Sequence, residues 1–423
     1  MRVLVDVSWL GLGHLYEDAR SGSYRAHLHL VEALARSGRC ELVLCANCSS
    51  VAHAGCLEYL PTNETLRPLP FLSPRAPLGQ SLRGAARWAH RSARRLVPNG
   101  AFLQAVRHYG RYVDQHVHPP VSDATPPVDV FHSPGSPLPP RPRRGRSPRR
   151  IVTIYDLAHG RYAHLHDDAR RQSMGQVLAS LHPDDWVITT SEATRAELHE
   201  LGVAPPERVF VTPLAADSAL FHPCRAPEEL EAVRTRLGIP PGPYLLALNV
   251  VDVRKNMDGA VRAFTRMVRQ EGARDLSFVL AGAPGRGTER LEGVLAEART
   301  AGARVVVTGY VPDADLAALY SGALAFVFPS LHEGFGLPVL EAMQCGTAVI
   351  SSNTSSLPEI VGDAGLTVDP LDLDALSAAM LALYRDDALR VRLGARALER
   401  AATFSWTRCS EETLAAYRAV LDA

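Results

Sequence analysis

Chemically useful side chains are most concentrated between Phe328 and Ile350, in the segment FPSLHEGFGLPVLEAMQCGTAVI. A short apolar strand is expected to end at Phe328, and a loop with two glycines follows it. Pro338 then stands where a helix can begin, because a first-turn proline lacks only an N–H that would have no partner there. Since the N-terminus of a helix binds anions, this segment predicts a phosphate site at the edge of a sheet.

Two carboxylates accompany the expected phosphate site, Glu333 in the loop and Glu341 about one turn into the helix. A carboxylate repels a phosphate, so the two side chains are expected to face hydroxyl groups of a sugar or a ribose. The alternative is that both glutamates only stabilise the positive end of the helix dipole. The residues alone leave the two interpretations equally open.

One lysine stands out in a chain that otherwise uses arginine. Of the 45 basic residues, 44 are arginine, and the single lysine is Lys255, directly after Arg254. Arginine and lysine are not interchangeable at a compact anion site. Lys255 is therefore a candidate anion ligand, and a solvated lysine at the start of a helix is the alternative.

The elements that must position these residues alternate along the whole chain. Short apolar runs bounded by glycine or proline are separated by helical stretches such as Ser23–Arg36. Continuous apolar strands of this kind form parallel sheets that helices cover on both faces. The sequence therefore predicts an α/β protein with two doubly wound Rossmann-like domains, joined in the proline-rich stretch between Pro213 and Gly242. The expected strands are Val3–Val7, Glu41–Cys45, Val128–Phe131, Ile151–Tyr155, Trp186–Thr189, Val209–Val211, Tyr244–Leu248, Leu276–Ala281, Val305–Thr308, Ala325–Phe328, Ala348–Ser351 and Leu366–Val368.

Length and composition fit two domains and exclude several other classes of protein. The 423 residues are enough for two units of about 200 residues each. A hydrophobic share of 46% with 21% charged residues excludes a disordered or fibrous chain. No apolar run approaches the ~20 residues of a membrane span, and the N-terminus lacks the features of a secretory signal. A cytoplasmic protein is therefore expected.

Neither the cysteines nor the paired aspartates predict a metal site. The seven cysteines are odd in number, so a disulfide framework is not expected. Cys45 and Cys48 have the spacing of a zinc pair, but no second pair follows. The Asp-x-Asp pairs that begin at Asp313 and Asp372 open expected helices, where carboxylates cap the N-terminus.

Positive charge is concentrated in one part of a chain whose net charge is zero. Between Arg75 and Arg150 there are 14 arginines against three aspartates, a surplus of 11 positive charges. Within this region, Leu82–Leu96 is helical in composition and carries Trp88. We expect no nucleic-acid partner; the hypotheses are peripheral contact with the inner face of a membrane or an anionic acceptor, and a solvated helix is the alternative.

The Glu-x7-Glu spacing in HEGFGLPVLEAM closely resembles the signature of the retaining nucleotide-sugar glycosyltransferases of family 4. The Arg-Lys-Asn element at Val253–Asn256 resembles the phosphate-binding element of the mannosyltransferase-like members. The resemblance spans nearly the whole chain and is weakest from Ala46 to Pro127. Further segments resemble the family in the same order, namely Gly22–Leu34, Thr153–Leu157, Gly309–Ala323, Ser356–Gly365 and Phe404–Tyr417.

The resemblance implies a GT-B fold, in which two Rossmann-like domains face each other across a cleft. Residues 1–215 would form the acceptor-side domain and residues 216–403 the domain that binds the nucleotide-sugar donor. Residues 404–423 would form a helix that packs back on the first domain. The implied reaction is transfer of a mannose-type or glucose-type hexose, with retention, from GDP- or UDP-hexose to an unidentified acceptor, which is anionic or lipid-linked in our hypothesis.

The resemblance also implies roles for particular residues of the donor site. Fixed cations and aligned N–H dipoles would stabilise the negative charge that develops on a departing nucleotide diphosphate. Glu341 would bind the hydroxyls of the ribose, and Glu333 would contact the donor sugar. The remaining implied ligands are Arg254 and Lys255 for the diphosphate, and the backbone of Gly336 and Leu337 for the sugar or phosphate.

The candidate catalytic residues are Glu333, His132 and Asp156. Many relatives carry a histidine before the Asp-Leu pair, whereas this chain has Tyr155 before Asp156. His132 ends the preceding strand and is expected to face the cleft from the same edge, in a catalytic or acceptor-binding role. A structural role is equally open. The resemblance implies no sure general base, because in this family the leaving phosphate can accept the acceptor's proton. Gly11-x-Gly13 is expected to form a loop that lines the acceptor side.

Two other functions compete with glycosyl transfer. A GT-B-fold epimerase or phosphorylase would act on related sugars, and a non-catalytic partner would only bind a nucleotide sugar. The second alternative predicts damage to the Glu-x7-Glu or Arg-Lys elements, and both are intact.

We predict that transfer needs no metal cofactor and survives chelation. Arg254 and Lys255 already supply positive charge at the expected diphosphate. Activity should therefore be the same before and after treatment with EDTA. Loss of activity in EDTA, with recovery on addition of manganese, would contradict this expectation.

Overall fold

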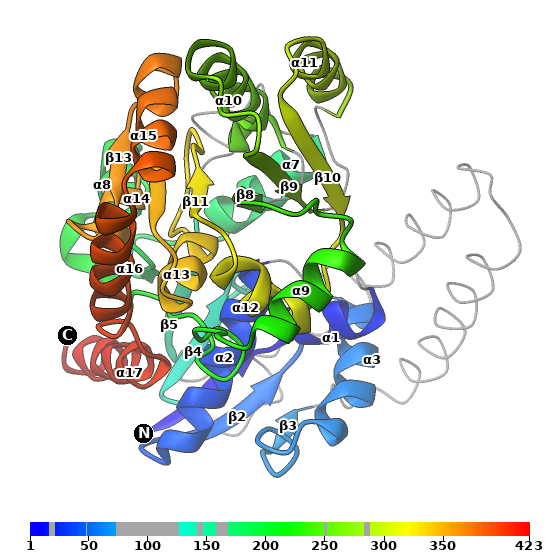
Figure 1. Cartoon of the computed structure of the whole chain (residues 1–423). Helices are drawn as coiled ribbons and strands as arrows, with labels where there is room; N and C mark the ends of the chain where they lie inside the picture. Colours follow the sequence, from blue (N-terminus) through cyan, green and yellow to red (C-terminus); the bar gives the residue numbers. More distant parts are fainter. Residues whose placement is uncertain are drawn as a thin grey trace, which may run out of the picture.

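The computed structural model describes residues 1–16, 22–47, 49–72, 127–141, 147–157, 168–248, 252–282 and 288–423. Within these residues the chain forms two parallel sheets covered by helices, as Figure 1 shows. The first sheet is built from the N-terminal half of the chain and the second from the C-terminal half. This architecture confirms the predicted α/β class with two doubly wound domains.

The first sheet has seven described strands in the order β3-β2-β1-β4-β5-β6-β7, and every neighbouring pair is parallel. Its strands are nearly continuous apolar runs, as expected when helices cover both faces. Their bounds are β1 Arg2–Asp6, β2 Glu41–Cys45, β3 Phe71–Leu72, β4 Val130–Pro134, β5 Arg149–Ile154, β6 Trp186–Thr189 and β7 Val209–Val211.

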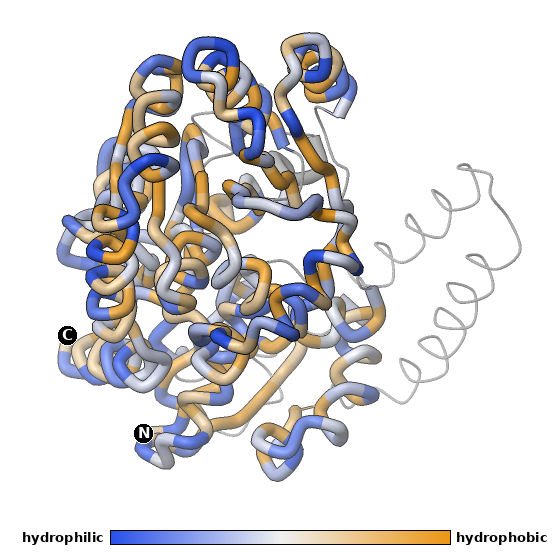
Figure 2. Tube along the Cα trace, viewed as in Figure 1, coloured by the Kyte–Doolittle hydropathy of each residue, from blue (hydrophilic) through white to orange (hydrophobic). Residues whose placement is uncertain are grey.

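The second sheet has six described strands in the order β10-β9-β8-β11-β12-β13, again all parallel. The four residues of β11 are buried. Figure 2 shows hydrophobic residues along the strands of this sheet. The bounds are β8 Tyr244–Leu248, β9 Ser277–Ala281, β10 Arg304–Gly309, β11 Ala325–Phe328, β12 Val349–Ser352 and β13 Leu366–Val368.

Helices connect the strands in both domains. In the first domain they are α1 Ser8–Leu15, α2 Gly22–Ser37, α3 Ser50–Tyr59, α7 Asp168–Ala179 and α8 Glu192–Glu200, with short 3₁₀ turns η2 Leu60–Thr62 and η5 Pro206–Arg208. In the second they are α9 Pro227–Arg236, η6 Val253–Lys255, α10 Met257–Glu271, α11 Thr288–Thr300, α12 Asp313–Ser321, α13 Leu337–Gln344, α14 Leu357–Val361, α15 Leu373–Arg385 and α16 Asp387–Ala401, followed by α17 Trp406–Asp422.

The two domains share one apolar core. Val5 of β1, Phe328 of β11 and Tyr417 of α17 belong to the same cluster of buried side chains. The last helix, α17, packs against α2 and β6 of the first domain. Trp406 at its start stacks on His29 of α2, with ring centroids 5.2 Å apart. Helix α17 therefore fastens the end of the chain to the first domain.

The expectation of a loop at Gly11-x-Gly13 is wrong, because both glycines lie inside helix α1. A Cβ atom on Gly11 would lie 2.0 Å from the carbonyl oxygen of Ala52 in α3. A Cβ atom on Gly55 of α3 would likewise lie 2.0 Å from the carbonyl oxygen of Gly11. The glycines thus allow the backbones of α1 and α3 to come into contact. This contact joins separate segments of the chain, so the local sequence around Gly11 does not predict it.

We predict that Gly11→Ala lowers the free energy of unfolding by about 2 kcal/mol or more, because backbone atoms must move apart to admit the methyl group. Gly293→Ala in α11 is the matched control, since a Cβ there meets nothing within 4 Å. That variant should be neutral or more stable by up to about 1 kcal/mol. Denaturant unfolding of both variants measures the difference, and equal effects would refute the close crossing of α1 and α3.

Candidate active site

The structure brings two loops together at the carboxyl edge of the second sheet. Strands β8 and β11 are neighbours there, and the strand order reverses between them, which is where open α/β sheets bind ligands. The chain after β8 reaches η6, and the chain after β11 forms the loop 329–336. The N–H of Leu331 donates to the carbonyl of Arg254 at 2.8 Å, which ties the two loops together.

Three charged side chains from these loops form one buried cluster. Glu333 is only 8% exposed. Its Oε1 accepts a hydrogen bond from Lys255 Nζ at 2.6 Å, and its Oε2 accepts one from Arg254 Nη1 at 3.0 Å. The hydroxyl of Ser330 also donates to Oε1 at 2.6 Å. The residues that the sequence assigned to the diphosphate and to the sugar therefore lie in direct contact.

The charges in this cluster keep Glu333 ionised. Burial alone would raise the pKa of its carboxyl, but Arg254, Lys255 and the hydrogen bonds from Lys255 and Ser330 together lower that pKa to about 2. Burial also lowers the pKa of the Lys255 ammonium, and Glu333 opposes that effect. A carboxylate with so low a pKa accepts hydrogen bonds from hydroxyl groups and does not act as a general acid near neutral pH.

The first domain contacts the loop 329–336 directly at Gly334. A Cβ atom on Gly334 would lie 1.9 Å from the carbonyl oxygen of Tyr155 and 2.6 Å from the Cβ of Asp156. The Gly334 carbonyl accepts hydrogen bonds from the hydroxyls of Thr190 at 3.1 Å and Thr194 at 3.4 Å. Only glycine allows this approach, which brings the predicted residue Asp156 beside the charged cluster.

Further polar contacts between the domains hold helix α8 against the second domain. His332 Nε2 lies 2.6 Å from a carboxylate oxygen of Glu197 in α8. The Glu359 carboxylate accepts hydrogen bonds from the N–H groups of Glu192 and Ala193, at 2.8 and 2.7 Å, at the start of the same helix. Sequence reasoning missed these residues, because each of them looks like an ordinary surface position in its own segment.

The start of helix α13 has the conformation expected of an anion site. Gly336 has a φ of 114°, in the region that favours glycine, and the helix begins at Leu337 with Pro338 in its first turn. The N–H of Val339 donates to the Gly336 carbonyl. The Leu337 side chain packs close to Gly22 at the start of α2 in the first domain, where a Cβ atom would lie 3.7 Å from Leu337 Cδ1. The N–H groups of Gly336 and Leu337 donate to no backbone carbonyl among the described residues, so they are the candidate anion donors.

Glu341 lies deeper than Glu333 and has different neighbours. Its side chain is 3% exposed, and one carboxylate oxygen accepts a hydrogen bond from the Tyr320 hydroxyl at 3.1 Å. The other oxygen lies 3.6 Å from Nη1 of Arg25, which belongs to α2 of the first domain. Burial raises the pKa of the Glu341 carboxyl, and Arg25 and Tyr320 oppose this rise.

The expectation that His132 faces the cleft is wrong. Its side chain has no exposed surface, Nδ1 lies 2.6 Å from the Tyr417 hydroxyl and Nε2 lies 2.7 Å from the Thr153 hydroxyl. Burial lowers the pKa of the imidazole to about 3, so the ring is neutral near pH 7. The side chain instead joins β4 to β5 and to the C-terminal helix.

The described residues contain no group of three His, Cys, Asp or Glu side chains placed to hold a metal ion. Asp372 caps α15 by accepting hydrogen bonds from the N–H groups of Asp374 and Ala375, as expected. Asp313 lies in the first turn of α12 but makes no capping bond, and Asp315 pairs with Arg236 at 2.7 Å. Cys45 is buried, whereas Cys48 lies outside the described residues.

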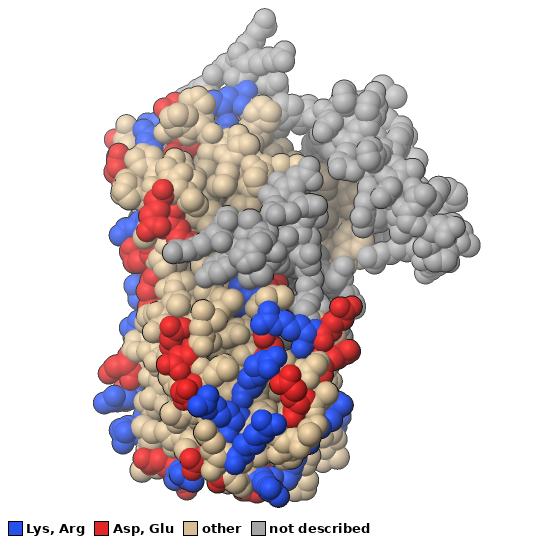
Figure 3. All heavy atoms as spheres, turned by 90° about the horizontal axis from the view of Figure 1, so that it is seen from above, with Lys and Arg blue, Asp and Glu red and all other residues tan. Residues whose placement is uncertain are grey.

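The arginine surplus lies largely outside the part of the chain that the structure describes. This holds for Leu82–Leu96 and Trp88, so membrane contact stays a hypothesis. No helix in the described ranges combines the length and the apolar character needed to cross a membrane. Figure 3 shows basic and acidic side chains interspersed on one described face, consistent with ion pairs such as Arg262–Glu297 and Arg385–Glu271.

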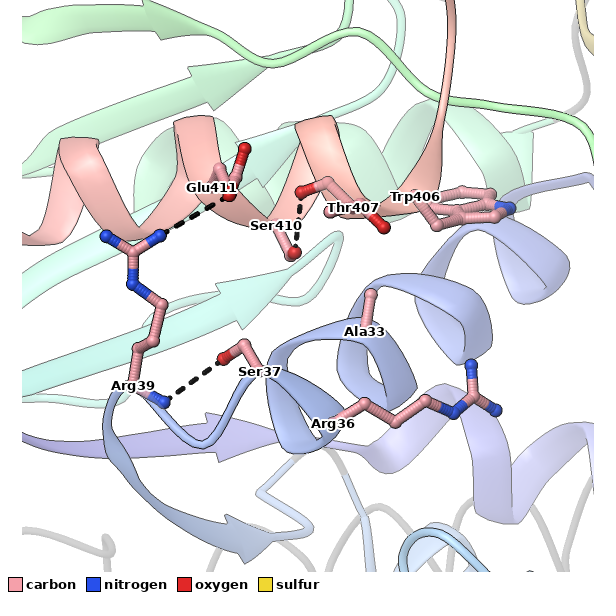
Figure 4. A pocket seen from close by; sticks show the side chains of 8 residues that line it. All are labelled: Ala33, Arg36, Ser37, Arg39, Trp406, Thr407, Ser410 and Glu411. Carbon is pink, nitrogen blue, oxygen red and sulfur yellow. Dashed lines mark hydrogen bonds and ion pairs between the residues drawn. The ribbon is translucent and has the colours of Figure 1, made fainter.

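A pocket of about 310 Å³ lies elsewhere, between α2 and α17 (Figure 4). Arg36 and Arg39 line it from the end of α2, and Trp406 and Ser410 line it from α17. Arg25 lies 11 residues before Arg36 on α2, which at 1.5 Å per residue separates them by roughly 16 Å. The pocket is thus distinct from the contact between Arg25 and Glu341, and none of the residues of the charged cluster lines it.

Comparison with known proteins places the site in a family. The model of the family described as glycosyl transferases group 1 matches residues 231–400, which contain the charged cluster and α13. The O-antigen chain mannosyltransferase B of Escherichia coli is 36% identical over 290 residues, which cover 68% of this chain and 74% of that protein.

Solved structures share the fold across the full chain. A sucrose-phosphate synthase from Thermosynechococcus elongatus has 21% identity and a TM-score of 0.65, covering 100% of this chain and 99% of its own. The Anabaena protein HepE, solved in complex with UDP and glucose, has 13% identity and a TM-score of 0.62, covering 99% of this chain and all of its own. At these identities the likeness concerns the fold, and it confirms the predicted GT-B architecture.

We predict that His132 is structural and that His132→Phe lowers the free energy of unfolding by about 2–4 kcal/mol, because the hydroxyls of Tyr417 and Thr153 lose their partner in a buried place. Adding Tyr417→Phe removes one of the unpaired hydroxyls and should recover part of the loss. At temperatures where the variant is folded, kcat should stay within about threefold of the parent protein. A drop in kcat of tenfold or more in folded His132→Phe would instead place this residue in the reaction.

Proposed function

The chain belongs to the group 1 glycosyltransferases, and we propose that it transfers a mannose-type hexose, with retention, from a nucleotide diphosphate donor to an acceptor hydroxyl. The observation that carries the proposal is the cluster of Arg254 and Lys255 with Glu333 beside the start of α13. Two fixed cations and a helix N-terminus are what a diphosphate leaving group requires. In support of this, the cations on η6 and the loop 329–336 meet beside the point where the strand order of the second sheet reverses.

In the proposed reaction the bond between the anomeric carbon and the β-phosphate oxygen breaks as the acceptor oxygen bonds to the same face of that carbon. The acceptor's proton passes to the departing phosphate oxygen, so no protein base is required. Arg254 and Lys255 stabilise the charge on that phosphate. The ionised Glu333 accepts hydrogen bonds from hydroxyls of the transferred sugar, and Asp156 borders the same space from the first domain.

We assign mannose as the sugar and GDP as its carrier for two reasons. The most extensive sequence similarity described above is to a mannosyltransferase, and the Arg-Lys-Asn element at Val253–Asn256 resembles the mannosyltransferase-like members. Glucose carried by UDP is the competing donor, because a protein of the same fold was solved with UDP and glucose. The acceptor stays unassigned.

Donor hydrolysis with a panel of nucleotide sugars tests the proposal. GDP-mannose should be cleaved faster than UDP-glucose, and proton NMR should show the released sugar first in the donor's own anomeric configuration. First release of the opposite anomer would contradict retention, and no cleavage or transfer with any donor of the panel would contradict the proposed reaction.

We predict that Lys255→Ala loses at least about 2 kcal/mol of transition-state stabilisation, the scale of a charge-assisted contact to the leaving group. Arg262→Ala in α10 is the matched control, because it also removes one positive charge from this domain but contacts Glu297 on the surface. Its kcat/KM should be unchanged. Near-normal turnover in folded Lys255→Ala would eliminate the diphosphate site.

We predict different effects on free nucleotide binding for the two glutamates. Glu341→Gln should weaken binding of the nucleoside diphosphate, because ribose is its proposed partner. Glu333→Gln should preserve or strengthen that binding, since it removes a negative charge beside Arg254 and Lys255, while it slows transfer. Calorimetry with GDP and UDP separates these roles, and equal losses in the two variants would show that the assignment is wrong.

A further inference from the structure

Arg25 is a charged residue from the first domain that reaches the donor side of the cleft. It lies near the start of α2, and its Nη1 is 3.6 Å from Oε1 of Glu341 in α13. That nitrogen is buried and has no hydrogen-bond partner among the described residues. The guanidinium as a whole is partly open, with 31% of the side chain exposed. Its positive charge therefore acts most strongly on Glu341 and less strongly on Asp313 of α12.

The surroundings of Glu341 do little else to favour a charged carboxylate. The Tyr320 hydroxyl of α12 donates one hydrogen bond to it. Asp313, also in α12, opposes the ionisation of Glu341. The Cys345 thiol, just beyond the end of α13, is a neutral neighbour, and burial and Glu341 raise its pKa. A buried carboxylate without a cation nearby takes up a proton instead of staying charged. Arg25 is the cation that these contacts provide.

We propose that Arg25 is a positioning residue for nucleotide binding, which keeps the buried Glu341 charged and directs its carboxylate at the ribose. This inference rests on the proposed function, in which Glu341 accepts hydrogen bonds from the ribose hydroxyls. A charged carboxylate accepts both of these bonds, whereas a protonated one loses acceptor capacity. Because Arg25 belongs to the first domain, the nucleotide site in the second domain then depends on contact between the two domains.

The test is the pH dependence of nucleotide binding by the full chain. GDP and UDP are each titrated calorimetrically into the parent protein and into Arg25→Gln at about pH 8 and about pH 5.5. Without Arg25 the pKa of Glu341 rises further, so its carboxylate becomes protonated at a higher pH. Between about pH 8 and about pH 5.5, Arg25→Gln should therefore lose about tenfold more nucleotide affinity than the parent protein loses. The comparison with the parent protein corrects for titration of the nucleotide's own phosphate.

Three further variants make the outcome specific. Arg25→Lys keeps the charge and should follow the pH profile of the parent protein. Arg25→Met is a second neutral variant with an apolar stem, and it should repeat the acid-sensitive loss. In the double variant Arg25→Gln with Glu341→Gln that extra loss should vanish, because the titrating group is gone. Thermal unfolding of each variant establishes that the folded protein is being titrated.

Two results would overturn the role of Arg25. One is a pH profile of the neutral variants that matches the parent protein, and the other is an acid-sensitive loss that persists after Glu341 is replaced. Failure of the proposed function looks different, because the parent protein would then bind neither GDP nor UDP at either pH.

Discussion

Glu333 is buried between Arg254 and Lys255, and the architecture around the site can be understood from what this arrangement requires. Removing a carboxylate and two cations from water is costly, at several kcal/mol per ion, unless the geometry of their contacts is good. Here the contacts are short, and Ser330 adds a further hydrogen bond to the carboxylate. Such geometry needs η6 and the loop 329–336 to meet, and they meet because β8 and β11 are adjacent strands of one sheet.

The first domain holds the same loop from the opposite side, and the two domains also share one apolar core. Thr190 and Thr194 bond to the carbonyl of Gly334, and the absence of a side chain there lets Tyr155 and Asp156 approach. Contacts at both ends of α8 and the packing of α17 on α2 hold that approach. If the proposed donor binds at the cluster, it would lie where both domains contact the loop 329–336.

Much of this was predictable from the sequence where the information is local. The bounds of β2, β6, β8 and β11 follow from apolar runs between glycine and proline, and the site motifs follow from their spacing. What depends on distant packing was not predictable. The side to which His132 points changes with a single residue of register, and its partner Tyr417 is 285 residues away. In sequence, Arg25 looks like any arginine of an amphipathic helix. Only its contact with Glu341 of the other domain distinguishes it.

The most direct test of the central claim, that Arg254 and Lys255 bind the donor's diphosphate, is the affinity ratio of a nucleoside diphosphate to the matching monophosphate. Calorimetry gives this ratio for the parent protein and for Lys255→Ala, with GDP and GMP as the pair. The second phosphate should strengthen binding by about tenfold or more in the parent protein, the effect of one charge-assisted contact, and add little in the variant. An equal ratio in the two proteins would contradict the account.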